Sequence, residues 1–414
     1  MTTSSLTDAR VAVAAAFFAQ GFVFISLTTR LPRFLERWGL DEIALSLLLL
    51  MMVLLAGVGS LVAEHAARNV GSAATLRLGL ALMVVAVPAI TLAPAIGVFV
   101  GGVAVYGVAL GLVDATTNMQ GVDLEHRYGR PILPSSHGYW TTGGISAAVL
   151  VLATGHLSPA VGAFVAVVPM LIAFARFLPH VVATQRIAPP GPAADDGPVP
   201  WRPIWLVGLG LVVFYMVDTT AAAWGPVYLA RSFDAPGNLV ALATFPYLVT
   251  SIVVRLAGGR LVTRFGVAPL LRVGAVMACG ALALVALAPS WQVAVVGFTI
   301  LGAAVALVAP LSFSAAGRIA AGTAGTANDP VAGTAAGPAP EPDRARTDAV
   351  IARFNQFNYV GALLGSVLTG FVGADNLRLG FALPAVLVLA LVPLAPAFAR
   401  GTLKRSGDRP VTWQ

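Results

Sequence analysis

The chain has 414 residues, of which 58% are hydrophobic and only 10% are charged, and its formal net charge is +7. One soluble core cannot bury so much apolar surface, so the composition excludes a soluble globular protein and predicts a polytopic membrane protein. The basic residues lie mostly in short loops between apolar runs. That distribution sets membrane orientation and does not predict nucleic acid as a partner.

Twelve apolar runs, each about 20 residues long, follow one another along the chain, as membrane-crossing helices require. The runs are continuously apolar, whereas the strands of a membrane barrel would alternate. The first run exceeds the apolar part of a signal peptide, so we expect it to remain as a helix. We therefore predict an all-α protein of twelve transmembrane helices. Their predicted bounds are 11–29, 42–63, 73–94, 96–118, 138–158, 160–181, 204–229, 237–257, 269–288, 291–315, 349–373 and 378–398.

The distribution of Lys and Arg predicts which side each loop occupies. With the N-terminus inside, 20 of these residues are cytoplasmic and five are outside. This bias places both termini in the cytoplasm. A single cysteine, Cys279, excludes an intrachain disulfide and a Cys-based metal site. We expect no metal or other cofactor. The five outer residues are Arg30, Arg33, Arg37, Arg231 and Arg378.

Two loops rich in Pro and small residues divide the predicted spans. The first, at 183–203, separates an N-terminal six-helix bundle, 1–182, from a C-terminal one, 204–400, and is predicted to be a cytoplasmic linker. The second, near 319–348, is predicted to be a disordered cytoplasmic insertion in the C-terminal bundle, because it has almost no large apolar residues. Residues 401–414 form a predicted cytoplasmic tail.

The two halves carry matching segments. TTRLPRFL ends span 1 and AWGPVYLA ends span 7, with Pro32 and Pro226 offset by 194 positions. SLVAEHAARNVG and GRLVTRFG follow spans 2 and 8 at nearly the same offset. A parallel duplication of six helices is typical of transporters whose substrate site lies between the halves near the membrane midplane.

Polar side chains separate inner helices from outer ones. Every third span is almost free of them and is predicted to face lipid, whereas the other eight carry polar stripes. In span 8, Thr244, Tyr247 and Ser251 share one helical face. Packing between helices would explain single stripes. It would not explain why every third span lacks one, so the pattern predicts a central polar cavity. Its aromatic and amide groups suit a sugar-like or other neutral organic solute. The candidate cavity residues are Gln20, Asn118, Trp140, Tyr215, Trp224, Tyr247, Asn355 and Asn358.

Two carboxylates lie within apolar spans and are the candidates for proton coupling. Asp218 lies near the middle of span 7, where a charge costs about 2.5–3.5 kcal/mol on insertion scales. A carboxylate held between helices can exchange a proton as access alternates, although it can also serve only to fasten helices. Asp114 lies one turn before Asn118, near the predicted cytoplasmic end of span 4. It either packs through hydrogen bonds or takes part in a gate.

The segment GRLVTRFG resembles the loop motif G-x-L-a-D-R-x-G of the major facilitator superfamily. Thr263 stands where that family has Asp, and in the first half Glu64 lies near the acidic position while Arg68 and Gly71 are out of register. The resemblance implies that the inner ends of helices 4, 5, 10 and 11 meet, which would bring an acid of span 4 towards a later arginine. The loop and gate candidates are Glu64, Arg68, Glu125, Gly259, Arg264, Gly266, Arg318 and Arg353.

A narrower resemblance, to a bacterial permease branch distantly similar to fucose-proton symporters, covers most of the chain. It rests on RLP at 30–32, on the segment 111–144 from GLVDATTNMQG to GYWTTGG, on SFSAAGR at 312–318 and on NYVGALLG at 358–365. The branch has E-G-A-M-A-D-W in span 7, which places Asp218 on the Glu and Ala223 on the Asp, so one of two acids is missing.

The resemblance implies a monomeric secondary active transporter in the bacterial plasma membrane. It would move a small organic solute by alternating access, coupled to a proton gradient, with the lipid bilayer and the solute as partners. Drug or metabolite efflux by antiport is the alternative, although span 5 lacks the G-P-x-x-G-G signature of drug-proton antiporters. A membrane-embedded enzyme is less favoured because the chain has neither H-E-x-x-H nor G-x-S-x-G.

Overall fold

The computed structural model describes residues 3–128, 133–155, 157, 159–178, 201–320, 354 and 356–399. All regular elements within these residues are helices, and nine of the helices are long and apolar enough to cross a membrane. The prediction of an all-α polytopic membrane protein is confirmed. Most of the predicted linker and insertion, and the whole predicted tail, lie outside the described residues.

The N-terminal half contains six of the predicted spans and one short helix that was not predicted. The spans are α1 (Thr3–Thr28), α3 (Glu42–Val70), α4 (Ser72–Thr91), α5 (Ile96–Tyr128), α6 (Leu133–Thr154) and the pair η1 (Pro159–Ala166) and α7 (Val167–Ala173). The short helix, α2 (Leu31–Trp38), has Pro32 in its first turn, buries Phe34 and Leu35, and ends at Gly39, whose φ is 60°. Proline suits a first helical turn and glycine a left-handed end, so the sequence itself explains α2.

The C-terminal half repeats this order, but its spans 7, 8, 10 and 12 each consist of more than one helical segment. Span 7 consists of α8 (Trp201–Thr219), the π-helical turn η2 (Thr220–Trp224) and α9 (Gly225–Phe233). Span 10 is divided into α12 and α13 around residues 306–307. The remaining elements are η3 (Leu239–Ala243), α10 (Phe245–Phe265), α11 (Val267–Ala286), α12 (Trp291–Val305), α13 (Val308–Ala320), α15 (Gln356–Val372), α16 (Leu377–Leu387), η4 (Val388–Ala390) and α17 (Leu391–Phe398).

Equivalent helices pack alike in the two halves. In the first half α1 packs on α6, and α5 packs on both α3 and α4; in the second, α8 packs on α15, and α12 packs on both α10 and α11. The junctions after α3 and α10 are also alike, because Gly71 and Gly266 have φ of 92° and 79°. Such angles favour glycine. Gly71 and Gly266 therefore occupy equivalent junctions, although Glu64 and Arg68 do not keep the spacing of the motif.

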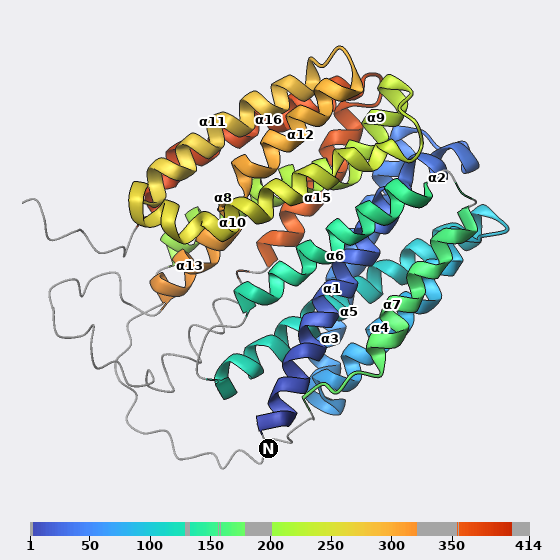
Figure 1. Ribbon diagram of the computed structural model, residues 1–414, viewed down its shortest axis with the longest axis vertical. Helices are drawn as coiled ribbons and strands as arrows, with labels where there is room; N and C mark the ends of the chain where they lie inside the picture. The colour runs from blue at the N-terminus through green and yellow to red at the C-terminus, as the bar shows by residue number, and fades with distance from the viewer. Residues whose placement is uncertain are drawn as a thin grey trace, which may run out of the picture.

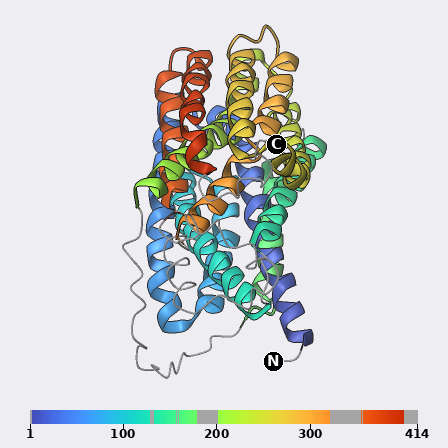
Figure 2. The same ribbon diagram turned by 90° about the vertical axis from the view of Figure 1, so that its left-hand side faces the viewer.

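The two halves lie side by side and are closest at one end. Figure 1 shows them converging where α2 meets α9 and separating towards α13 and the N-terminus, and Figure 2 shows the C-terminal helices as one group above the N-terminal ones. Contacts between halves run from α3 to α15, from α6 to α10 and η3, and from α1 to η2. At the converging end Arg231 donates from Nη2 to the Leu40 carbonyl at 2.9 Å, and Asn238 donates to the Leu152 carbonyl at 3.3 Å.

Candidate functional site

Polar side chains from five helices gather between the halves. We call them the central cluster, and they come from α1, α5, α8, α10 and α15. They lie on helices that the sequence marks with polar stripes, and each helix presents its polar face to the interface while its apolar faces pack elsewhere. The members are Gln20, Asp114, Asp218, Tyr247, Arg255 and Tyr359.

Asp114 joins three helices of the cluster. Gln20 donates from Nε2 to Oδ1 of Asp114 at 3.1 Å, and the Tyr359 hydroxyl donates to Oδ2 at 2.9 Å. The bond from Tyr359 crosses from the C-terminal half to the N-terminal one. The sequence placed Asp114 near the cytoplasmic end of its span, but α5 continues to Tyr128, so Asp114 is in the helix interior. Asn118 donates to the Asp114 backbone carbonyl at 2.9 Å and so bonds along its own helix.

Asp218 lies at a break in its helix. It is the second-last residue of α8 and is separated from the π-helical turn only by Thr219. Such turns are rare and frequently found at functional sites. The Tyr247 hydroxyl of α10 donates to Asp218 Oδ1 at 2.5 Å. Within the described part of the chain, Oδ2 has no hydrogen-bond partner, and the side chain is half-buried. One carboxylate oxygen is thus held and the other is free to take a proton or a ligand.

Arg255, near the middle of α10, belongs to the cluster but was not among the sequence candidates. Its Nε donates to the Ala306 carbonyl, at the break between α12 and α13, at 3.1 Å. Its Nη1 donates at 3.3 Å to Thr141 of α6, in the other half. Its charge also interacts with Asp218. The spacing along span 8 could have identified this residue. Arg255 follows Ser251 by four positions and so continues the polar stripe of that span.

That stripe is otherwise as expected. Thr244, directly before α10, and Tyr247 and Ser251 within it are all buried. Two further groups lie within electrostatic reach of Arg255: Tyr215 of α8, which is half-buried, and His137 of α6, which is exposed and has its ring centroid 4.9 Å from that of Phe17. His137 also interacts with Asp114.

Among the described residues, no three His, Cys, Asp or Glu side chains gather in a way that could hold a metal ion.

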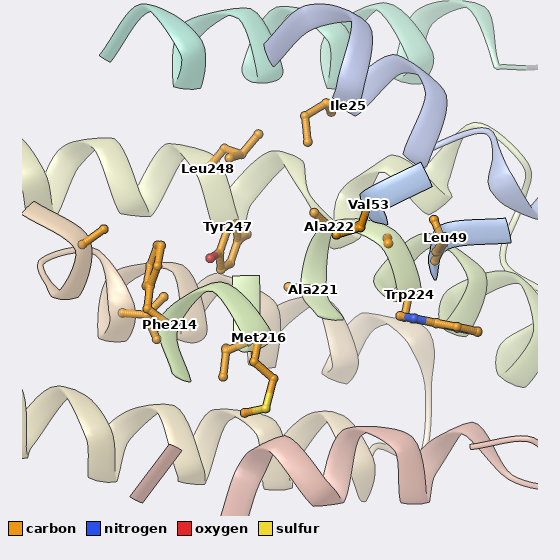
Figure 3. Packing of buried hydrophobic residues seen from close by; sticks show 14 of the residues in the cluster. Ile25, Leu49, Val53, Phe214, Met216, Ala221, Ala222, Trp224, Tyr247 and Leu248 are labelled. Carbon is orange, nitrogen blue, oxygen red and sulfur yellow. The ribbon is translucent and has the colours of Figure 1, made fainter. Parts of the chain in front are cut away.

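The remaining cavity candidates take different places. Trp224 has no exposed surface and donates from Nε1 to the Ser366 carbonyl at 3.0 Å, so it packs in the core rather than forming a wall. Figure 3 shows it on η2 with Leu49 and Val53 of α3 nearby. Trp140 is half-buried against Phe24, at 6.2 Å between ring centroids. Asn358 is half-buried on α15, and Asn355 lies outside the described residues.

The loop candidates form local contacts. Glu64 and Arg68 form an exposed ion pair one turn apart on α3. At the matching end of α10 the guanidinium of Arg264 lies 5.2 Å from the ring centroid of Phe265, and Thr263, where the family has Asp, bonds to the Gly259 carbonyl at 2.9 Å.

Of the expected gate pairings, the structure tests only that of Asp114 with Arg318, and these two residues do not form an ion pair. Arg318 donates to the carbonyl of Phe398 on α17 at 3.1 Å, and both oxygens of Asp114 are engaged by Gln20 and Tyr359. The Glu125 side chain and the whole of Arg353, the other members of that prediction, lie outside what the structure describes.

Comparison with known proteins finds transporters among the relatives in sequence. No family model matches the chain. It is 24% identical over 401 residues to an uncharacterized MFS-type transporter of Yersinia pestis, covering 94% of this chain and 96% of that protein. It is 25% identical over 317 residues to the uncharacterized transporter y4wD of Sinorhizobium fredii, covering 73% of this chain and 81% of that one.

Solved structures agree in fold. A D-xylose-proton symporter superposes with a TM-score of 0.67 at 14% identity, covering 96% of this chain and 99% of that one. The fucose:proton symporter of E. coli superposes with a TM-score of 0.55 at 15% identity, covering 94% and 97%. These findings confirm the resemblance carried by the loop and span motifs. The chain therefore has the fold of the major facilitator superfamily, and it is similar in sequence to transporters of that type.

Proposed function

We propose that this protein is a secondary active transporter that moves a small organic solute by alternating access and couples that movement to protons. The observation that carries the proposal is Asp218, an acid between the two halves with one oxygen bonded to Tyr247 and the other free. It lies beside a π-helical turn, in the first helix of the second repeat.

The arrangement of the halves supports alternating access. Transporters of this architecture rock one half against the other around a site near the midplane, which is often built from interrupted helices. Here the breaks at η2 and between α12 and α13 both adjoin the central cluster, through Asp218 and through the bond from Arg255 to Ala306. The bonds from Tyr359 to Asp114 and from Arg255 to Thr141 cross between halves and would break as the halves separate.

The two acids differ in a way that favours Asp218 for proton coupling. Both oxygens of Asp114 accept hydrogen bonds, so a proton on either oxygen would compete with a donor already bonded there. Asp218 can take a proton on Oδ2 while Tyr247 continues to bond Oδ1. Two solved structures of this fold are named as proton symporters of fucose and xylose, which supports uptake over efflux here.

The test uses the purified full-length protein in proteoliposomes with an imposed pH gradient. A thermal-shift screen of sugars, organic acids and drug-like cations first selects a solute. Wild-type vesicles should then accumulate it against its gradient, whereas Asp218→Asn should bring the accumulation ratio to about 1 and leave solute exchange intact, because only the proton-driven step needs the acid. Asp375→Asn, an exposed loop acid, is the matched control. Normal accumulation by Asp218→Asn would remove Asp218 as the coupling site.

A further inference from the structure

We propose that Arg255 binds an anionic group of the solute, so that the transported compound is a hydroxylated organic acid rather than a neutral sugar. This inference rests on the proposed transport function and assigns its substrate class. It starts from a cation near the middle of a membrane-crossing helix, where charged residues are rare and mark substrate or ion pathways.

The hydrogen-bonding capacity of Arg255 is only partly used. A guanidinium has five N–H donors and cannot lose its charge in a protein. Two contacts are made, from Nε to the Ala306 carbonyl and from Nη1 to Thr141. Both acceptors are neutral oxygens, so they orient the side chain without compensating its charge.

The charge of Arg255 is not paired at close range with any carboxylate that the structure describes. Asp218 interacts with Arg255 only through space and bonds to Tyr247 instead. A charge removed from water needs a partner, and the side chain is half-buried and so remains reachable. The planar fork of a guanidinium matches a carboxylate in two parallel hydrogen bonds.

The charges around Arg255 link anion binding to the proton. With Asp218 ionised, a bound carboxylate would face an uncompensated negative charge, and with Asp218 protonated it would face Arg255 alone. Protonation and anion binding therefore favour each other, as proton-coupled uptake of an acid requires. The titratable groups that interact with Arg255 are His137 from α6, Tyr215 and Asp218 from α8, and Tyr247 from α10.

Other cluster groups suit hydroxyls on the same solute. Within the described chain, the Tyr215 hydroxyl and Asp218 Oδ2 have no hydrogen-bond partners. Gln20 keeps an unpartnered Oε1, also among the described residues. These groups supply both donors and acceptors, which hydroxyls can satisfy.

The experiment compares charged solutes with matched neutral ones. Thermal shift in detergent and uptake into proteoliposomes are measured for lactate, gluconate and quinate, each beside its uncharged amide or alcohol. Wild type should bind and accumulate at least one acid in preference to its neutral partner, and more tightly at lower pH. Arg255→Gln should weaken acid binding at least about tenfold, the loss expected for a charge-assisted pair. Arg260→Gln, exposed on the same helix, should leave it unchanged.

Arg255→Lys keeps the positive charge but lacks the planar guanidinium, and it replaces Arg255→Gln in the experiment if that variant does not fold. Arg255→Lys should bind the acid with an affinity between those of wild type and Arg255→Gln. Preference for the neutral partners, or an acid preference that survives both substitutions, would overturn the inference while leaving transport intact. If no solute of any class moves under a pH gradient, the proposed function fails. Arg255-dependent binding of the acids in detergent still decides the anion site in that case.

Discussion

Asp114 is bonded to a residue of each half of the molecule, Gln20 and Tyr359. Asp114→Asn keeps its size but leaves one buried donor facing an NH2 group, and an unsatisfied partner of a charged group costs about 1.5–3 kcal/mol. We expect Asp114→Asn to lower the apparent Tm of the purified protein. Tyr359→Phe should lower it less, and the two effects should be non-additive because they remove the same bond. Additive shifts would show that the two residues act separately.

The sequence predicted the central residues unevenly. Asp114, Asp218, Gln20 and Tyr247 were recognised because a polar atom in a continuously apolar run is conspicuous. Arg255 was instead counted with the cytoplasmic loop charges, because it lies only a few residues from the predicted end of its span. Hydropathy places the ends of a span poorly, so it cannot tell an arginine in a site from one at a boundary. Here the helical spacing of Arg255 from Ser251 was a better indication that Arg255 belongs to the site.

At the scale of helices, hydropathy predicted where the spans lie but not how they are interrupted. The π-helical turn at η2 falls in a segment rich in alanine, TAAAW, that by itself favours an unbroken helix. A tertiary contact accompanies the turn: Thr220, which bonds to the Met216 carbonyl of its own helix, also bonds to Thr369 of α15, at 2.8 Å each. The short helix α2 was missed because it is too short and too polar to resemble a span. Contacts that depend on distant helices cannot be read from local pattern.

The approach of α15 to α3 depends on a glycine. A Cβ at Gly370 would lie 1.8 Å from Ser46 Oγ and 2.4 Å from a ring carbon of Trp224. Gly370→Ala should therefore separate the halves at their converging end and slow transport, because the closed arrangement there becomes strained. A reporter cysteine at Asn238, in a Cys279→Ser background, should react faster with a water-soluble maleimide.

Gly280→Ala on α11 is the matched control for that substitution, since an added Cβ there meets nothing within 4 Å. Both variants gain the same methyl group in an apolar helix, so only the contact differs. Equal labelling rates and equal transport in the two variants would show that the contact at Gly370 does not hold the halves together.

At the scale of the whole molecule, the arginines predicted to lie outside have structural partners. Each of the five donates to a backbone carbonyl: Arg30 to Ser26, Arg33 to Leu157, Arg37 to Thr91 and Ala93, Arg231 to Leu40, and Arg378 to Ala286. Burial and the neighbouring Arg33 lower the pKa of Arg30 to about 10, which still leaves it charged at neutral pH. Carbonyls at helix ends are natural acceptors for such side chains. A structural role thus accounts for the five positive charges at this end of the molecule. These charges do not decide which side of the membrane this end faces.

The orientation itself can be tested. The Lys and Arg bias predicts that both termini are cytoplasmic and that the loop after α9, near Asp234, is on the opposite side. A fluorescent protein that matures only in the cytoplasm should therefore fluoresce when fused after Gln414. Alkaline phosphatase, which is active only outside the cytoplasm, should be inactive there and active when fused after Asp234. The reverse result at both positions would invert the topology, and the end at which Gly370 meets Ser46 would then face the cytoplasm.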